Sequence, residues 1–255
     1  MYGAMVAAGV LAGLWVVRRL GTRVKLNDEH ITNLAIYCVF AGLAGAKLFM
    51  FLFDWELYAS RPGEIFTLTT LQAAGVYQGG FLLALGFALW YIRRNQMPVL
   101  TTMDVFAPGI ALGHAFGRIG CFCAGCCYGT ECRRAWAVEF NNIEAYKLSG
   151  TPLGVPLHPT QLYEAAFNLA LFAFLYRFFQ SGPRAGQVFG AYLTLYSVFR
   201  FCVEFVRHHE QGLLWGLSNT QWISMATLPI GLWLYVRPLL TAGPGGGTPA
   251  QAGSH

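Results

Sequence analysis

The chain has 255 residues, of which 55% are hydrophobic and only 11% are charged, and its mean hydropathy is +0.46. This composition excludes an ordinary soluble domain and predicts an all-α integral membrane protein, long enough for about seven spans of roughly 20 residues. The net charge of +5 is weak evidence for a nucleic-acid partner, and we find no nucleic-acid motif, P-loop, dinucleotide-binding fingerprint or internal repeat.

Seven apolar stretches predict seven transmembrane helices. In chain order they lie at about residues 2–17, 32–53, 72–92, 104–120, 159–180, 187–206 and 221–236. The first stretch has no basic segment before it and no A-x-A site after it, so we interpret it as a span that stays rather than a signal peptide. Residues 1–237 would then form one polytopic membrane domain. Residues 121–158 are expected to fold as a small polar head, and the Gly- and Pro-rich residues 238–255 as a disordered tail.

The predicted loops differ in their content of Lys and Arg, and cytoplasmic loops carry the excess of these residues. Nine of them lie on one side of the membrane and four on the other. The side with nine holds Arg18, Arg19, Arg23, Lys25, Arg93, Arg94, Arg177, Arg184 and Arg237; the side with four holds Arg61, Arg133, Arg134 and Lys147. We therefore expect the head and the N-terminus outside the cytoplasm and the C-terminal tail inside it.

The fourth predicted span combines small residues with a charge. Gly109, Gly113 and Gly117 recur at every fourth position, a spacing that lets membrane helices approach closely. Arg118 follows, and a charge within a span usually faces a protein interior or a wet cavity. Its planar fork of donors suits a phosphate, so we expect Arg118 to hold a phospholipid head group near one membrane face. His114, one helical turn earlier, is predicted to be a packed, hydrogen-bonded residue.

Further charges lie in the other spans. Arg200, Glu204 and Arg207 share one helical face of the sixth span, and Glu164 follows His158 in the segment HPTQLYE at the start of the fifth. Two interpretations stay open: a structural network of salt bridges, or a site in which excess positive charge binds phosphate through bidentate Arg contacts. At membrane level, four basic groups stand against three acids, namely Lys47, Arg118, Arg200 and Arg207 against Asp104, Glu164 and Glu204.

Two local expectations follow from these positions. Arg118 and Arg200 both lie in the outer half of the bilayer, at depths that long side chains can bridge, so we expect them to converge on one phosphate-sized site. His158 and Glu164 are expected to act together at the outer end of the fifth span, chiefly by tying the head to the helices.

These residues, in this order, resemble the prolipoprotein diacylglyceryl transferase family over the whole chain. The segment from His158 to Glu164 is a very close match to the family's HPSQLYE. The other matching pieces are Tyr2-Gly3, Arg18-Arg19, the Gly-rich segment Gly42 to Lys47, Asp104-x-x-Ala-Pro, Gly117-Arg118-x-Gly120, Phe199-Arg200, Glu204 and Phe205-x-Arg207.

The resemblance implies a multi-pass enzyme of the bacterial cytoplasmic (inner) membrane. It would move a diacylglyceryl group from phosphatidylglycerol, or a related anionic phospholipid, to the thiol of a lipobox cysteine in a prolipoprotein signal peptide. The implied catalytic residues are Arg118, Arg200, Glu204 and Tyr2; the implied substrate-binding residues are Gln78, Gly79, Gly80, Asp104, Gly129, His158, Glu164 and Arg207. Arg118 and Arg200 would bind the departing phosphate, and Glu204 and Arg207 would orient them. We expect no metal, no cofactor and no nucleic acid.

The chain departs from the family pattern at two places. The family's His-Gly-Gly, whose His is a proposed base, is matched by Gln78-Gly79-Gly80, and an amide cannot take up a proton at neutral pH. In the run after the Gly-Arg signature, Cys121 and Cys126 stand in place of an Asn and a Glu. Two alternatives therefore stay open: the same phospholipid donor with a different acceptor, or a non-catalytic lipid-binding or redox-sensing membrane protein.

A cluster of cysteines follows the fourth span. Its members are Cys121, Cys123, Cys126, Cys127 and Cys132. We expect at least one disulfide among them, because the outer face of a bacterial membrane is an oxidising environment. Reduced packing cysteines and a metal or catalytic site are the alternatives, and the catalytic one would use a thiolate near Arg118.

Overall fold

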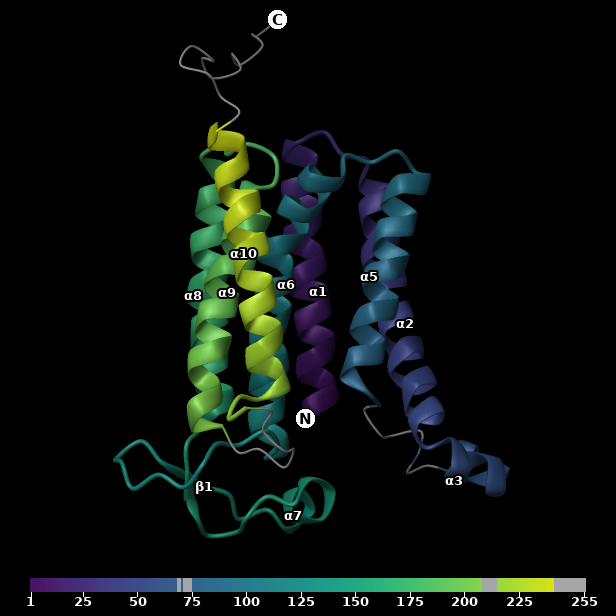
Figure 1. Cartoon of the computed structure of the whole chain (residues 1–255), viewed down its shortest axis with the longest axis vertical. Helices are drawn as coiled ribbons and strands as arrows, with labels where there is room; N and C mark the ends of the chain where they lie inside the picture. Colours follow the sequence, from purple (N-terminus) through teal and green to yellow (C-terminus); the bar gives the residue numbers. More distant parts are fainter. Residues whose placement is uncertain (68–69, 71–74, 208–214, 241–255) are drawn as a thin grey trace, which may run out of the picture. The chain divides into compact units, whose positions relative to one another are not determined.

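The structure is a computed structural model that describes residues 1–67, 70, 75–207 and 215–240 (Figure 1). The chain divides into two compact units, Met1–Val17 with Met103–His255, and Arg18–Thr102. Each is built from helices, apart from one short antiparallel pair of strands in the first unit.

The first unit contains most of α1 (Tyr2–Arg23) and α6 (Val99–Ala124), followed by α8 (Thr160–Gln180), α9 (Gln187–Val203), the 3-10 turn η2 (Glu204–Val206) and α10 (Asn219–Leu240). Helices α8, α9 and α10 lie side by side in Figure 1, and α9 packs against both of the others. Helix α1 meets α6 through small residues: a Cβ added at Gly13 would lie 3.0 Å from the carbonyl oxygen of Gly109. The close helix contact predicted from the glycine spacing is thus present at Gly109 and Gly113, whereas a Cβ added at Gly117 would meet nothing within 4 Å.

The polar head lies at one end of this helix group, between α6 and α8. It contains β1 (Val138–Glu139), α7 (Ile143–Ser149) and β2 (Pro156–Leu157), with β1 antiparallel to β2. Its small core is formed by Tyr128, Phe140 and Leu157. Because the head begins where α6 ends and finishes where α8 begins, it anchors the two helix ends that carry Arg118 and Glu164.

The second unit contains α2 (Asp28–Phe53), α3 (Trp55–Ser60), the 3-10 helix η1 (Pro62–Phe66) and α5 (Tyr77–Arg94). Helices α2 and α5 approach closely through glycines. A Cβ added at Gly45 would lie 2.5 Å from the carbonyl oxygen of Gly79, and one at Gly80 would lie 2.8 Å from that of Gly42. In this unit Lys47 donates a hydrogen bond of 2.6 Å to the carbonyl oxygen of Thr70.

The structure confirms an all-helical membrane protein, but the count of seven spans is not confirmed. Within the described residues, six helices are long and apolar enough to cross a bilayer. The expected third span corresponds to α5, which has 18 residues, begins Tyr77-Gln78-Gly79-Gly80 and ends at Arg93-Arg94. The polar and charged residues at both ends of α5 make this helix less apolar. The expected tail also begins later, because α10 continues to Leu240; residues 241–255 lie outside the described residues.

Candidate functional site

Arg118 lies in the last part of α6, where it meets a carboxylate from α8. Its Nε donates a hydrogen bond to Nε2 of His114 at 3.2 Å and lies 3.0 Å from Oε2 of Glu164. The single Nε hydrogen points to His114, so the contact with Glu164 is an ion pair. His114 is thus a hydrogen-bonded residue, as predicted, and as an acceptor it holds the guanidinium in place.

Glu164 also binds a second arginine. Its Oε1 lies 3.2 Å from Nη1 of Arg207, and its side chain is fully buried. Helix α9 ends at Val203, and the turn η2 carries the chain to Arg207, whose extended backbone pairs with that of Gly129. One carboxylate on α8 therefore joins α6 to the segment that follows α9.

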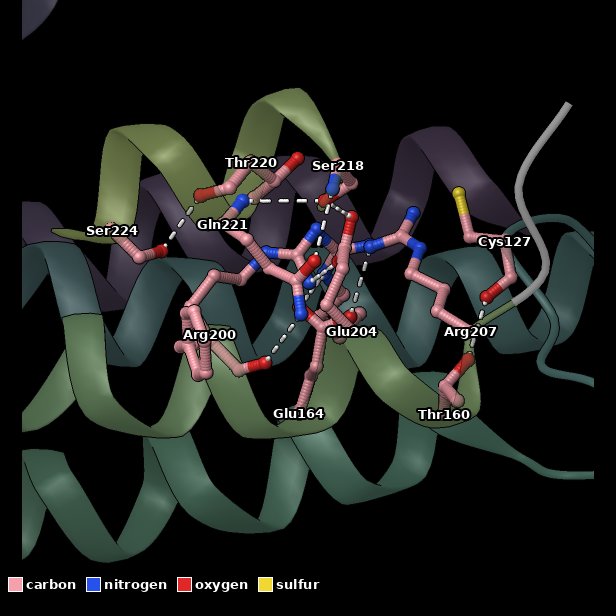
Figure 2. A network of polar contacts seen from close by, with 12 residues as sticks. Cys127, Thr160, Glu164, Arg200, Glu204, Arg207, Ser218, Thr220, Gln221 and Ser224 are labelled. Atoms are coloured by element: carbon pink, nitrogen blue, oxygen red, sulfur yellow. Dashed lines mark hydrogen bonds and ion pairs between the residues drawn. The ribbon is translucent and has the colours of Figure 1, made fainter. Parts of the chain in front are cut away.

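A second ion pair joins the last turn of α9 to η2. Arg200 pairs with Glu204 through a short contact, and the other oxygen of Glu204 accepts a hydrogen bond of 2.9 Å from the Ser218 hydroxyl (Figure 2). Gln221 accepts from the backbone N–H of Ser218 at 2.9 Å and donates to the carbonyl of Phe201 at 3.4 Å. The start of α10 is thereby fixed to the end of α9.

The two ion pairs belong to one electropositive site. His114 accepts the hydrogen bond from Arg118 and also interacts electrostatically with Arg200 and Arg207, so the three guanidinium groups share one electrostatic neighbourhood. The two carboxylates of the network, Glu164 and Glu204, are buried and compensate two of these charges. Three guanidinium groups offer about fifteen N–H donors, whereas two carboxylates accept about eight hydrogen bonds. A structural salt-bridge network accounts for both acids but leaves one positive charge and several donors for an anion.

The segment HPTQLYE holds the site at the start of α8, residue by residue. Thr160 donates to the carbonyl oxygen of Cys127 at 2.9 Å, and Gln161 donates to that of Cys126 at 2.7 Å. Nδ1 of His158 lies 3.1 Å from the Tyr163 hydroxyl, and its backbone exchanges hydrogen bonds with the chain at Gly129 and Thr130. His158 and Glu164 have separate side-chain partners, Tyr163 for the first and the two arginines for the second. The head is tied to α8 by backbone, Thr and Gln contacts, and joint action of His158 with Glu164 stays a prediction.

Gly129 sits where no side chain fits. A Cβ there would lie 2.5 Å from the carbonyl oxygen of Val206 and 2.6 Å from Cβ of His158. The backbone N–H of Gly129 donates to the carbonyl of His158 at 2.9 Å, and Thr130 donates to that of Val206, also at 2.9 Å. Because it has no side chain, Gly129 allows the backbones of the head, the start of α8 and the end of η2 to approach closely beside Arg207. This close approach is its role at the site.

Asp104 has a different environment from the other buried acids. Its two carboxylate oxygens accept hydrogen bonds from the backbone N–H groups of Gly186 at 2.6 Å and Phe189 at 2.8 Å, which begin α9. Arg118 is fourteen residues further along α6, about 21 Å at the rise of an α-helix. These contacts make Asp104 a cap for α9, whereas its assignment to the substrate site stays a prediction.

The cysteine cluster adjoins the arginines. All seven cysteines of the chain are free, which corrects the expectation of a disulfide. The Sγ atoms of Cys121, Cys126 and Cys127 lie within 4.8 Å of one another, whereas Cys132 is buried in the head and Cys123 is exposed. Hydrogen bonds from the other two thiols lower the pKa of Cys127, and the charges of Arg207 and Arg118 lower it further. The hydrogen bonds of Cys126 with Cys121 and Cys127 raise the pKa of Cys126. Cys127 is therefore the first of these two to ionise.

Tyr2 lies at the same end of α6. Its Cδ2 would be 3.2 Å from a Cβ added at Gly120, and its phenol interacts electrostatically with Arg118 and with the three clustered thiols. The structure thus brings together Tyr2, Arg118, Gly129, His158, Glu164, Arg200, Glu204 and Arg207 within the first unit. Gln78, Gly79 and Gly80 belong to the second unit, where Gly79 and Gly80 serve close packing of α5 on α2 and Gln78 is exposed.

Two contributors to this network were not predicted from the sequence. Ser218 and Gln221 lie at the start of α10 in no recognisable motif, and only the packing of α10 on α9 brings them to Glu204. The sequence predicted a hydrogen bond for His114 but not its partner, although the spacing of four residues before Arg118 on one helix could have indicated it.

Comparisons with known proteins agree with the geometry. The family model described as "Prolipoprotein diacylglyceryl transferase" matches residues 1–237. The chain is 34% identical over 234 residues to a Clostridium tetani protein named phosphatidylglycerol–prolipoprotein diacylglyceryl transferase, covering 92% of this chain and 91% of that one. It is 35% identical over 236 residues to the transferase numbered 2 of Clostridium perfringens, covering 92% and 89%. A Dehalococcoides mccartyi protein of the same name is 32% identical over 237 residues, with 92% and 87% covered.

Proposed function

Since the chain belongs to the prolipoprotein diacylglyceryl transferase family, we propose that it transfers the diacylglyceryl group of phosphatidylglycerol to a cysteine thiol of a prolipoprotein. The names of its relatives supply the donor and the acceptor class. A different acceptor, or a lipid-binding protein without catalysis, is not favoured by a family match that covers 1–237.

The reaction is an alkylation of sulfur. The acceptor thiol gives up its proton, and its sulfur forms a bond to the terminal carbon of the diacylglyceryl group. The bond between that carbon and the phosphate oxygen breaks, and glycerol phosphate leaves with the electron pair. The departing phosphate gains negative charge as the bond breaks, so groups that stabilise that charge lower the barrier.

The arginine network supplies such groups. The observation that carries the proposal is the set of three guanidinium groups, those of Arg118, Arg200 and Arg207, paired with only two buried carboxylates. We assign Arg118 and Arg200 to the phosphate, because a guanidinium binds phosphate oxygens through paired N–H donors. Glu164 fixes Arg118 and Arg207, and Glu204 fixes Arg200. Tyr2, beside Arg118, would line the phospholipid cavity.

We also propose a cellular location and an orientation in the membrane for the protein. The protein is an integral membrane protein, and we assign it to the bacterial cytoplasmic membrane with the head outside the cytoplasm. The excess of Lys and Arg in the loops at the opposite end supports this orientation. The N-terminus would lie outside and the C-terminus inside if α5 also crosses the bilayer. Reporter fusions after Arg94 and after Lys147 should then fall in opposite compartments.

A transfer assay tests the function. Purified protein is incubated with phosphatidylglycerol labelled in its acyl chains and with a lipobox peptide, and the peptide is analysed by mass spectrometry. The expected product carries one diacylglyceryl group on the cysteine, and glycerol phosphate is released with it. A peptide with Ser in place of its cysteine is the control. An unmodified cysteine peptide, under conditions in which the protein binds phosphatidylglycerol, would contradict the proposal.

A further inference from the structure

Three thiols meet at the outer end of α6, beside the arginine site. Cys121 lies in the last turn of α6, and Cys126 and Cys127 lie in the turn that follows it. Their Sγ atoms are all within 4.8 Å of one another, and each residue is partly buried. The proposed phosphate site uses none of the three.

The main chain holds these thiols in position from outside the cluster. The N–H of Cys126 donates to the carbonyl of Cys121 at 3.1 Å, which closes the turn. The carbonyls of Cys126 and Cys127 accept hydrogen bonds from Gln161 and Thr160 of α8. Cys127 has φ 64°, a left-handed conformation that side chains other than Gly, Asn and Asp seldom adopt. The surrounding contacts thus maintain a conformation that directs three sulfur atoms to one point.

The donor set suits a thiophilic metal ion. Zinc binds thiolate sulfur at about 2.3 Å in a tetrahedron, so two sulfurs on the same ion lie about 3.8 Å apart. Because the Sγ atoms are all within 4.8 Å of one another, each pair needs to approach by at most about 1 Å. Sites with three protein ligands leave a fourth position of the zinc tetrahedron for water or substrate, whereas structural zinc sites have four protein ligands. Arg118 and Arg207 interact with the Cys127 thiol and offset the negative charge that a three-thiolate zinc complex retains.

We propose that Cys121, Cys126 and Cys127 bind one zinc ion through their thiolates and leave its fourth position for the thiol of the acceptor cysteine. This inference rests on the proposed function. A thiol that binds zinc loses its proton, here to solvent, and remains a nucleophile. The zinc-bound sulfur then attacks the diacylglyceryl carbon, and the phosphate leaves toward the arginines. Zinc does not change its oxidation state, so no oxidant or reductant is needed.

The inference also accounts for a difference from the family pattern. Where the resemblance places a His as proposed base, this chain has Gln78, and an amide cannot accept the thiol proton. Zinc coordination activates the acceptor thiol without a side-chain base. The expectation of no metal rests on the resemblance alone. Because the three thiols converge, we replace that expectation with a zinc site.

Metal content is the first test. The full chain is purified in detergent under reducing conditions, incubated with zinc, passed through a desalting column and analysed for bound metal. We expect about one zinc per chain for the wild type. We expect each serine variant of a proposed ligand to retain less than about a tenth of this zinc, because the loss of a direct ligand costs at least the tenfold in affinity that the loss of an outer partner costs. These variants are Cys121→Ser, Cys126→Ser and Cys127→Ser. Cys123→Ser is the matched control, from the same stretch but exposed, and should bind zinc as the wild type does.

X-ray absorption of the zinc-loaded wild type adds a measurement that needs no variant. Three sulfur neighbours and one lighter neighbour are expected, and four sulfurs after a cysteine lipobox peptide is added. A wild-type chain that binds no zinc, binds another metal in its place, or carries a disulfide among the three cysteines would overturn the proposal. So would equal zinc loss in Cys123→Ser.

Chelation separates this inference from the proposed function. Zinc-depleted wild type should still bind phosphatidylglycerol but lose more than about nine-tenths of its transfer rate, and added zinc should restore it. Full transfer by the depleted enzyme would refute the role of zinc but not the proposed transferase activity. A zinc-loaded chain that binds the peptide but never transfers a lipid would refute the proposed transferase activity but not the metal site.

Discussion

The two units of the chain are packed in different ways. In the second unit, α2 and α5 meet at glycines: a Cβ on Gly45 would lie 2.5 Å from the Gly79 carbonyl oxygen, and one on Gly80 would lie 2.8 Å from the Gly42 carbonyl oxygen. In the first unit, α6, α8 and the end of α9 meet around Glu164 and its two arginines. Glycine contacts hold helices together by close approach alone. Buried charges cost far more, and we propose that the cluster of them around Glu164 is where the chemistry takes place.

The largest expected effect comes from removing the shared carboxylate. Glu164→Gln leaves Arg118 and Arg207 without their buried partner, which typically costs about 3–5 kcal/mol. We expect a large fall in thermal stability together with loss of transfer. Glu131→Gln is the matched control, because Glu131 forms an exposed ion pair with Arg133 that is worth roughly 0–1 kcal/mol. Equal melting temperatures for the two variants would refute a central role for Glu164.

The glycine-packed pair gives the next largest effect. In Gly45→Ala the new methyl group meets the Gly79 carbonyl at 2.5 Å, and overpacking of this kind costs about 1–3 kcal/mol. Gly86→Ala is the control on α5, where a Cβ meets nothing within 4 Å, and it should be neutral or slightly stabilising. Stability is measured by denaturant titration. If Gly45→Ala proved as stable as the control, close packing of α2 on α5 would not explain these glycines.

Asp104 sharpens the comparison from within the first unit, because it is buried but faces backbone N–H groups. Asp104→Asn weakens the cap of α9 and should cost about 1 kcal/mol, the usual value of a lost cap. Phosphatidylglycerol binding should stay at the wild-type level in the folded variant. A selective loss of binding without loss of stability would return Asp104 to the substrate site.

The smallest effect is expected at Gln78, which is exposed at the start of α5. Gln78→Ala should change the transfer rate by no more than about twofold, the range of surface substitutions that remove no specific contact. Gln78→His is the companion variant, because it restores the residue of the family pattern. A drop of tenfold or more in Gln78→Ala would assign this amide a role in the reaction.

The sequence indicated which charged residues of the first unit would be buried better than it indicated their partners. Charges in apolar segments identified Arg118, Glu164, Arg200 and Glu204 without any structure, because such residues are too costly to be incidental. Their partners depended on helix packing. Glu164 and Arg207 are separated by 43 positions, and the pairing arises only because η2 ends α9 beside α8.

Other features could not be read from residue order for similar reasons. Asp104 looked like one more membrane-level acid, and only the position of the first residues of α9 shows it to be a cap. The spacing of the cysteines did not show which thiols meet, since the positive φ of Cys127 and the contacts from α8 decide it. The third span was predicted from an apolar run whose helix proved to be 18 residues long.

The measurement that tests the account most directly is phosphatidylglycerol binding by Arg118→Lys and Arg200→Lys, with folding checked by thermal melting. Lys keeps the charge but lacks the paired donors, so each variant should bind about tenfold to a hundredfold more weakly, the value of charged hydrogen bonds. Arg133→Lys, at an exposed position of the head, is the control and should bind as the wild type does. Wild-type binding by both folded site variants would contradict the phosphate site, and with it the assignment of the arginine network to catalysis.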